Sequence, residues 1–237
     1  MDLALEITRR CNQNCYHCLR GDKQNRNMAE YTIYRAISQA DEGMGFLGLT
    51  GGEPLIAMDQ MWQVWWQIVR TQNYPSSIYI ATSAPFHKLE RFREWVNTVT
   101  SCDVELHVAV STDKYHEDTK YSYYKLCELI EYYKGVILAE RDVYNIICMG
   151  KSDYGDSVHI HQESEHPDLY VNVHGRVLPS CDISYKCQND PRLNLGNVCD
   201  SNFSYAKAHS IFLSKYPDGI SVRQEDDRLI IKQEVYA

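Results

Sequence analysis

Between residues 3 and 150, short apolar segments alternate with longer segments of helical periodicity, and this alternation is the strongest constraint on the fold. Strands that alternate with helices of this length are typical of βαβ units and a parallel sheet. We expect strands at residues 3–8, 46–49, 77–82, 104–111 and 143–148, and helices at residues 31–42, 58–70, 87–99 and 121–134. About five such units are too few to close an eightfold barrel, so the pattern predicts an α/β fold with an open, partial barrel.

The sequence changes character after residue 150, where a polar stretch at residues 151–166 is expected to form a loop or linker. A β-hairpin is expected around His174 and Gly175, because glycine tolerates the positive φ of a tight turn. Later elements are expected to be a helix at residues 203–216 and a second hairpin formed by residues 220–223 and 229–235. We therefore divide the chain into a core, residues 1–150, and a small C-terminal hairpin and helix extension, residues 151–237.

Composition narrows the range of partners and compartments. The chain has 237 residues, 44% of them hydrophobic and 24% charged, which is typical of a globular protein. A net charge of −8 argues against nucleic acid as the main partner, because phosphate binding requires a basic surface. Neither a signal peptide nor an apolar run long enough to span a membrane is visible, so we expect a cytoplasmic protein. In that compartment nine cysteines indicate metal or redox chemistry more than disulfides.

Three of these cysteines form a compact array directly after the first expected strand. Cys11, Cys15 and Cys18 follow a C-x₃-C-x₂-C spacing. A [4Fe–4S] cluster is normally held by four thiolates, so three on one loop can bind three irons and leave the fourth open to a small molecule. Zinc is the alternative, with His17 or a distant cysteine as fourth ligand. The spacing alone favours iron–sulfur over zinc, and a chance cluster is the least favoured interpretation.

A second motif, Gly51-Gly52-Glu53-Pro54, follows the next expected strand. Together with the cysteine array, in this order and context, it resembles the radical SAM superfamily over roughly residues 3–150. The resemblance implies a partial (β/α)₆ TIM-like barrel, with a [4Fe–4S] cluster and S-adenosylmethionine as cofactors. In that family the reduced cluster cleaves S-adenosylmethionine to methionine and a 5′-deoxyadenosyl radical, which abstracts a hydrogen atom from the substrate.

The resemblance also implies roles for individual residues. Cys11, Cys15 and Cys18 would be the catalytic cluster ligands. His17 occupies the aromatic position before the last cysteine, which in the family lies near the adenine; a surface histidine is the competing interpretation.

The glycine-rich motif carries further implied roles. Gly51 and Gly52 would let the backbone approach the methionine moiety, since neither has a side chain to block it. Glu53 is suited to hold the methionine ammonium group, and Pro54 stiffens the turn.

Two later strand ends resemble family contacts to S-adenosylmethionine less closely. Ser83 follows the third expected strand, where the family often carries small polar residues. Ser111 and Asp113 follow the fourth and resemble a Ser-x-Asp pattern that contacts the ribose or methionine side. A solvated turn is the alternative for each.

The tail contains a second group of cysteines, Cys181, Cys187 and Cys199. With the expected hairpin before Cys181 and a Gly-Asn segment ending at Asn197, this region resembles the SPASM extension or its shorter twitch form. Such extensions bind auxiliary [4Fe–4S] clusters. Here three ligands could hold a second iron–sulfur cluster, the tail could be a remnant that binds none, or zinc could be held with His174.

The SPASM-like tail makes a peptide or protein the expected substrate, by analogy with the family. The alternatives are an activase-like or small-molecule-modifying radical SAM enzyme, and a zinc-stabilised interaction module without enzymatic activity. An electron donor such as flavodoxin or ferredoxin is the other expected partner.

Overall fold

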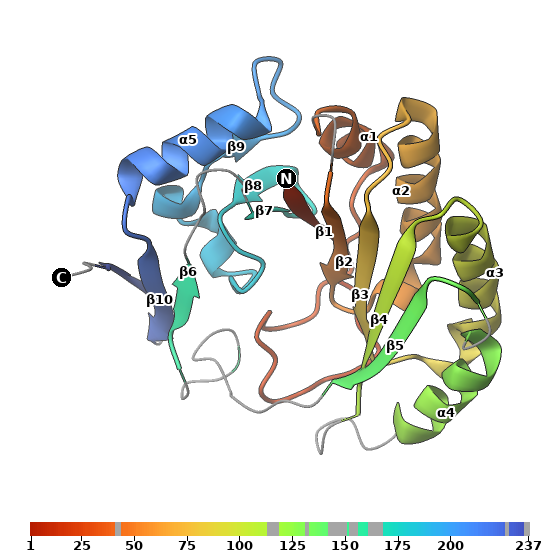
Figure 1. Cartoon of the computed structure of the whole chain (residues 1–237). Helices are drawn as coiled ribbons and strands as arrows, with labels where there is room; N and C mark the ends of the chain where they lie inside the picture. Colours follow the sequence, from red (N-terminus) through yellow and green to blue (C-terminus); the bar gives the residue numbers. More distant parts are fainter. Residues whose placement is uncertain are drawn as a thin grey trace.

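The computed structural model describes residues 1–40, 44–112, 119–130, 133–141, 151, 156–160, 168–225 and 228–234. Helices line the outer face of a curved sheet, and the C-terminal part of the chain lies across from them (Figure 1). The loop that carries Cys11, Cys15 and Cys18, called the cysteine loop below, emerges between these two parts (Figure 1).

The core is built on five neighbouring parallel strands: β1 (Asp2–Thr8), β2 (Phe46–Gly51), β3 (Ser77–Thr82), β4 (Glu105–Ser111) and β5 (Val136–Arg141). They belong to an eight-stranded sheet in the order β5-β4-β3-β2-β1-β7-β8-β9. β5 and β9 stand at its two ends, so the described strands form an open sheet rather than a closed barrel. The predicted α/β class with a partial barrel is confirmed.

Four helices connect the parallel strands and cover one face of the sheet (Figure 1): α1 (Glu30–Ser38), α2 (Met58–Thr71), α3 (Leu89–Thr100) and α4 (Thr119–Ile130). Their buried residues recur every three or four positions, as Met61, Val64, Trp65 and Ile68 do in α2. This spacing places one apolar stripe against the sheet. Parallel strands buried in this way bring all their carboxyl ends to one edge, where such folds build their sites.

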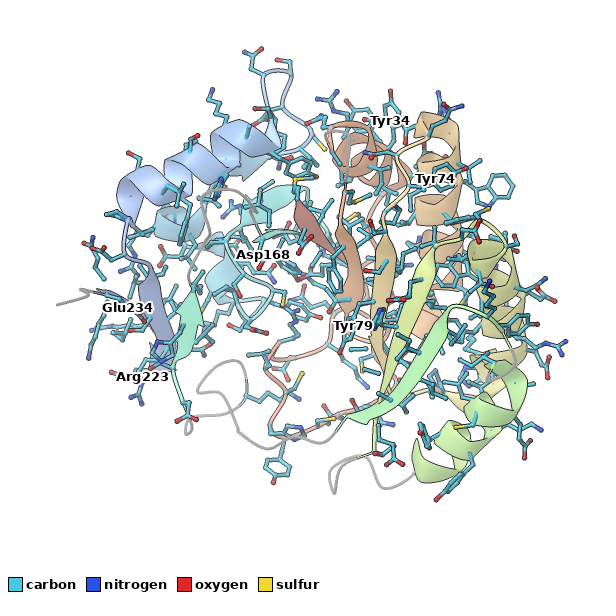
Figure 2. All side chains as sticks on the ribbon, viewed as in Figure 1. Tyr34, Tyr74, Tyr79, Asp168, Arg223 and Glu234 are labelled. Carbon is cyan, nitrogen blue, oxygen red and sulfur yellow. The ribbon has the colours of Figure 1, made fainter. Side chains whose placement is uncertain are left out.

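The extension continues the same sheet. β7 (Asp168–Val171) pairs in parallel with β1, with Asp2 opposite Asp168, which is labelled in Figure 2. β8 (Arg176–Leu178) and β9 (Gly196–Asn197) then add antiparallel strands. β1 therefore lies between the core and the extension, and the loop that follows it can contact both.

The rest of the extension forms a second layer. α5 (Tyr205–Lys215) is capped at its N-terminus by Ser204, whose side chain accepts a hydrogen bond from the Lys207 N–H. A three-stranded sheet follows, formed by β6 (Val158–Ile160), β10 (Ile220–Glu225) and β11 (Arg228–Gln233). The expected second hairpin corresponds to β10 and β11, which pair in an antiparallel manner.

The elements differ from the sequence-based expectations in four places. β5 was not expected, while the strand expected at residues 143–148 lies outside the described residues. β6 lies in a stretch that was expected to be a loop. Its pairing partner, β10, lies far along the chain, so local sequence pattern does not indicate this strand. Within the described residues, α1 stops at Ser38 instead of reaching residue 42. α4 begins at Thr119 and ends at Ile130, earlier than the expected helix.

Among the described residues, no helix is both long enough and apolar enough to cross a membrane.

Candidate functional site

The cysteine loop leaves β1 at its carboxyl end and returns alongside it. The Arg9 N–H donates to the Arg26 carbonyl at 2.8 Å, and the Met28 N–H donates to the Ile7 carbonyl at 2.9 Å. These bonds close the base of the loop, so its middle projects from the sheet edge. Within the loop, the Gln13 N–H donates to Cys11 Sγ at 3.4 Å.

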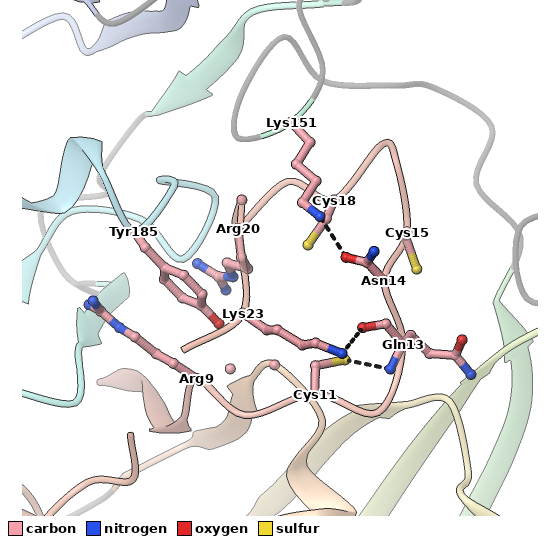
Figure 3. Close-up of a pocket in the computed structure, with 13 residues that line it drawn as sticks. Arg9, Cys11, Gln13, Asn14, Cys15, Cys18, Arg20, Lys23, Lys151 and Tyr185 are labelled. Carbon is pink, nitrogen blue, oxygen red and sulfur yellow. Dashed lines mark hydrogen bonds between the residues drawn. The ribbon is translucent and has the colours of Figure 1, made fainter. Parts of the chain in front are cut away.

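Cys11, Cys15 and Cys18 line one pocket together (Figure 3). The pocket is open to solvent and contains about 360 Å³ of empty space. The backbone of Gly51 and Gly52 forms part of its wall. Four cationic side chains complete its surroundings: Arg9, Arg20, Lys23 and Lys151. None of the described lining residues is acidic. Arg9 is paired with Glu6 and Lys151 with Asp22, so the positive charge of the wall comes mainly from Arg20 and Lys23; this charge favours an anionic occupant.

The two glycines of the motif are required by the packing of the chain on itself. A Cβ on Gly51, whose φ is +140°, would lie 1.9 Å from the Thr8 carbonyl oxygen. A Cβ on Gly52 would lie 2.2 Å from the Arg10 carbonyl oxygen. Hydrogen bonds hold the same contact, from the Gly52 N–H to Thr8 and from the Glu53 N–H to Arg10. The motif thus supports the start of the cysteine loop, in addition to its predicted role towards the methionine moiety.

Glu53 is buried and bonded to the end of β3. Its carboxylate accepts hydrogen bonds from the hydroxyl of Thr82 at 2.6 Å and from the N–H and hydroxyl of Ser83, each at 2.7 Å. A fourth bond comes from the Leu55 N–H at the start of a 3₁₀ turn that begins at Pro54. Burial raises the pKa of Glu53, and these bonds partly offset the rise. Its predicted contact with an ammonium group stays a prediction.

The thiol of Cys11 is partly buried, and its surroundings affect its pKa. The pKa of Cys11 is raised to about 11, mainly by burial; the hydrogen bond from the Gln13 N–H opposes the rise, and the nearby Glu53, Cys18 and Cys15 contribute to it. A thiol with this pKa carries its proton at neutral pH, and metal binding must displace that proton. The three cysteines that line one pocket, the cationic side chains and the close glycine backbone nevertheless fit a cluster bound by three cysteines.

A buried polar network joins the loop to the extension. Glu6, on β1, accepts hydrogen bonds from Arg9 Nε at 2.5 Å, from Gln188 Nε2 at 2.8 Å and from the Tyr170 hydroxyl. Arg9 Nη2 also donates to Gln188 Oε1 at 2.6 Å. Because Gln188 contacts both members of the Glu6–Arg9 ion pair, it ties the base of the cysteine loop to the extension.

Arg20 forms a second connection, on the other side of the array. Its guanidinium donates to the carbonyl oxygens of Cys181 and Ile183 and lies 5.0 Å from the centre of the Tyr170 ring. The Lys151 N–H also donates to the Cys18 carbonyl at 3.0 Å. The cysteine loop is therefore anchored to the extension on both sides of its three thiols.

Two of the remaining predicted residues, His17 and Ser111, are outside the pocket lining. His17 is half-buried, with its ring centre 5.4 Å from that of Tyr16, and it is outside the pocket lining. Ser111 ends β4, where it pairs with Arg141 of β5. Asp113 lies outside the described residues. The structure brings Ser83 to the motif through its bonds to Glu53, next to Thr82, which bonds the same carboxylate.

The C-terminal cysteines lie against different elements. Cys187 Sγ is 3.4 Å from Gln224 Oε1 of β10, and Cys199 Sγ is 3.8 Å from the Thr32 hydroxyl of α1. Cys181 Sγ is 3.6 Å from its neighbour Asp182. His174, the alternative zinc ligand, is exposed at the tip of the hairpin. In the described part of the chain, no three cysteine, histidine or acidic side chains already meet at metal-binding distance, and this holds for both cysteine groups.

Sequence reasoning missed the cationic residues of the pocket and Tyr185, which lines it from the extension. Arg9 precedes the array and Arg20 follows it, so their positions in the sequence were an available signal. Tyr185 offered no such signal, because its approach depends on how the extension packs.

Comparison with known proteins assigns the chain to a family. A family model described as a 4Fe-4S single cluster domain matches residues 6–128, while no curated protein matches the chain. Two solved structures share its fold: native anSMEcpe with bound AdoMet (13% identity) and native anSMEcpe with bound AdoMet and Cp18Cys peptide (12% identity). In both cases the TM-score is 0.61, and the match covers 87% of this chain and 79% of the other. The chain therefore belongs to the 4Fe-4S single cluster domain family and, by its motifs and shared fold, to the radical SAM superfamily.

Proposed function

We propose that this protein is a radical SAM enzyme that abstracts a hydrogen atom from a peptide or protein substrate. The observation that carries the proposal is that Cys11, Cys15 and Cys18 line one pocket whose wall includes the Gly51–Gly52 backbone. When bound there, a [4Fe–4S] cluster and S-adenosylmethionine would supply a 5′-deoxyadenosyl radical.

The chain's own residues have separate tasks in this proposal. Cys11, Cys15 and Cys18 hold the cluster. Gly51 and Gly52 allow the loop and the motif to approach closely, and Glu53 joins the motif to the end of β3. The cationic side chains balance the negative charge of a cluster with three thiolate ligands.

A peptide substrate is supported by the SPASM-like tail and by the fold shared with a protein whose structure contains a peptide. The extension also lies against the cysteine loop, through Arg20 and Gln188. A substrate held by the extension would therefore be close to the site where the radical forms.

The first test measures 5′-deoxyadenosine released by anaerobically purified protein given S-adenosylmethionine and dithionite. The intact protein should release it, and Cys15→Ala should not. Cys102→Ala is the matched control, because Cys102 is an exposed cysteine outside the pocket. Release by Cys15→Ala at the wild-type rate would refute the ligand assignment.

The second test addresses the substrate class. Peptides from a perdeuterated protein digest should transfer deuterium into 5′-deoxyadenosine, because the radical takes its hydrogen atom from the substrate. A perdeuterated small-metabolite extract serves as the competing pool. Deuterium transfer from the metabolites alone would replace the peptide proposal with a small-molecule substrate.

A further inference from the structure

Tyr185 belongs to the extension, yet it lines the pocket of the three cysteines. It is 4% exposed, and Figure 3 shows its phenol reaching towards the cysteine side of the pocket. None of the roles described above uses this side chain.

Residues on both sides of the cysteine array hold the ring in place. The Tyr185 N–H donates to the Arg20 carbonyl at 3.0 Å. On the other side, the Arg9 guanidinium lies 4.5 Å from the centre of the Tyr185 ring, a cation–π contact. Because Arg9 precedes Cys11 and Arg20 follows Cys18, the position of the phenol is coupled to the loop that carries the thiols.

The hydroxyl of Tyr185 is buried and has no hydrogen-bond partner among the described residues. Other buried tyrosines of the extension differ: the Tyr170 hydroxyl donates to Glu6, and the Tyr205 hydroxyl donates to the Ala36 carbonyl at 2.9 Å. Buried hydroxyl groups are normally paired, and an exception calls for a physical explanation. Its place in the cysteine pocket points to a partner supplied by the occupant of that pocket.

The occupant that the family implies is rich in hydrogen-bond acceptors. A [4Fe–4S] cluster presents sulfide and thiolate sulfurs, whereas a phenol with an ordinary pKa near 10 is a donor at neutral pH. Cys18 and Tyr185 line the same pocket (Figure 3). The hydroxyl therefore lies at the pocket that the cysteines line and has the right chemistry to meet sulfur.

We propose that Tyr185 is a positioning residue for the cluster, whose hydroxyl donates a hydrogen bond to sulfur, either a cluster sulfide or the Cys18 thiolate. Reduction places more negative charge on these sulfurs, so the bond favours the reduced cluster and raises its potential. This inference rests on the proposed cluster site, but not on the substrate or on cleavage of S-adenosylmethionine. It gives the extension a direct part in tuning the electron-transfer step.

The test compares the holoprotein with Tyr185→Phe by redox titration followed by electron paramagnetic resonance. The variant should keep its iron and show a more negative midpoint potential. After exchange into D₂O, the wild-type reduced cluster should show an exchangeable proton coupling that Tyr185→Phe lacks. Tyr205→Phe is the matched control, because its hydroxyl bonds to α1 and should leave both readouts unchanged.

Several outcomes would overturn the inference. One is an unchanged potential in an iron-replete Tyr185→Phe; another is the absence of an exchangeable coupling in the wild type, which needs no variant. An equal shift in Tyr170→Phe would mean that the polar network, not the bond to sulfur, sets the potential. If Tyr185→Phe shows the expected more negative potential but the wild type releases no 5′-deoxyadenosine, the proposed function is refuted and this inference stands.

Discussion

The two cysteine groups of this chain have the same number of members and very different surroundings. Cys11, Cys15 and Cys18 come from one loop and line one pocket. The other group, Cys181, Cys187 and Cys199, is distributed over contacts with Asp182, β10 and α1. Closely spaced cysteines share a site because a single closed loop carries them, whereas the later three follow separate packing demands.

The comparison also shows what the extension does for the loop. Its residues Gln188 and Tyr185 contact the base and the pocket of the cysteine loop, while its own cysteines stay apart. We therefore expect the extension to stabilise and tune the first site, and iron counting decides between this expectation and the alternative of a second iron–sulfur cluster.

Cysteine substitution has the largest expected effect. Replacing Cys11, Cys15 or Cys18 with alanine should remove the cluster and reduce bound iron from about four per chain to near zero. Replacing Cys181, Cys187 and Cys199 together should leave the iron content unchanged, because these side chains lie against different elements. Iron and sulfide assays on anaerobically reconstituted protein provide the measurement.

A count of about eight irons per chain, falling to about four in the triple C-terminal variant, would contradict this expectation. It would establish an auxiliary cluster and require the extension to rearrange around metal.

Two glycine substitutions, one beside the cysteine loop and one in the extension, test how much the backbone of each region matters for stability and cluster assembly. Gly52→Ala should cost at least about 3 kcal/mol and prevent cluster assembly, since its Cβ would overlap the Arg10 carbonyl oxygen and backbone cannot move aside easily. Gly175→Ala, in the hairpin of the extension, should cost about 1–2 kcal/mol through its φ of +80°. There the nearest atom is Asn197 Oδ1, at the end of a side chain.

Thermal unfolding and iron content measure both effects. If Gly175→Ala lost as much iron as Gly52→Ala, the hairpin of the extension would be as important to the cluster as the glycine motif itself.

Sequence periodicity predicted the parts of the fold that depend on local pattern. β3 occupies the expected residues 77–82, and its buried Ile78 and Ile80 alternate with partly exposed neighbours. Periodicity could not predict contacts between distant segments. The pairing of β1 with β7 and the bond between Glu6 and Gln188, 182 residues apart, depend on tertiary packing.

The same distinction holds at the site. The array and the Gly-Gly-Glu-Pro motif were visible because each is contiguous in the sequence. Ser83 was placed at a strand end by pattern, but its bond to Glu53 required the register of β2 and β3. Tyr185 was invisible because the extension brings it to the pocket from the far side of β1.

Removing the link between the two regions should have an intermediate effect. Gln188→Leu leaves Glu6 and Arg9 without a shared buried partner, at an expected cost of about 2–3 kcal/mol. Gln67→Leu is the matched control: Gln67 is also buried, but its side-chain oxygen has no partner among the described residues. Denaturant unfolding measures both. Equal losses in the two variants would show that Gln188 contributes packing and no specific link.

The two buried carboxylates beside the loop provide the finest distinction. Glu6, on the extension side, is paired with the cationic Arg9, whereas the four donors to Glu53 are neutral. Glu53→Gln should cost about 1–2 kcal/mol, because the new amide N–H would face backbone N–H groups that cannot turn away. This loss should be smaller than that of Gln188→Leu.

The effect of Glu53 should also depend on pH, in a direction set by its raised pKa. Between the ordinary glutamate pKa and the raised one, the folded protein holds a proton that the unfolded chain has released, so stability falls as pH rises. The advantage of the wild type over Glu53→Gln should be greatest below the ordinary pKa, decline through that interval and then stay constant. Unfolding midpoints of both proteins across a pH series provide the measurement. An advantage that grew with pH would mean that the four hydrogen bonds outweigh burial and lower the pKa of Glu53.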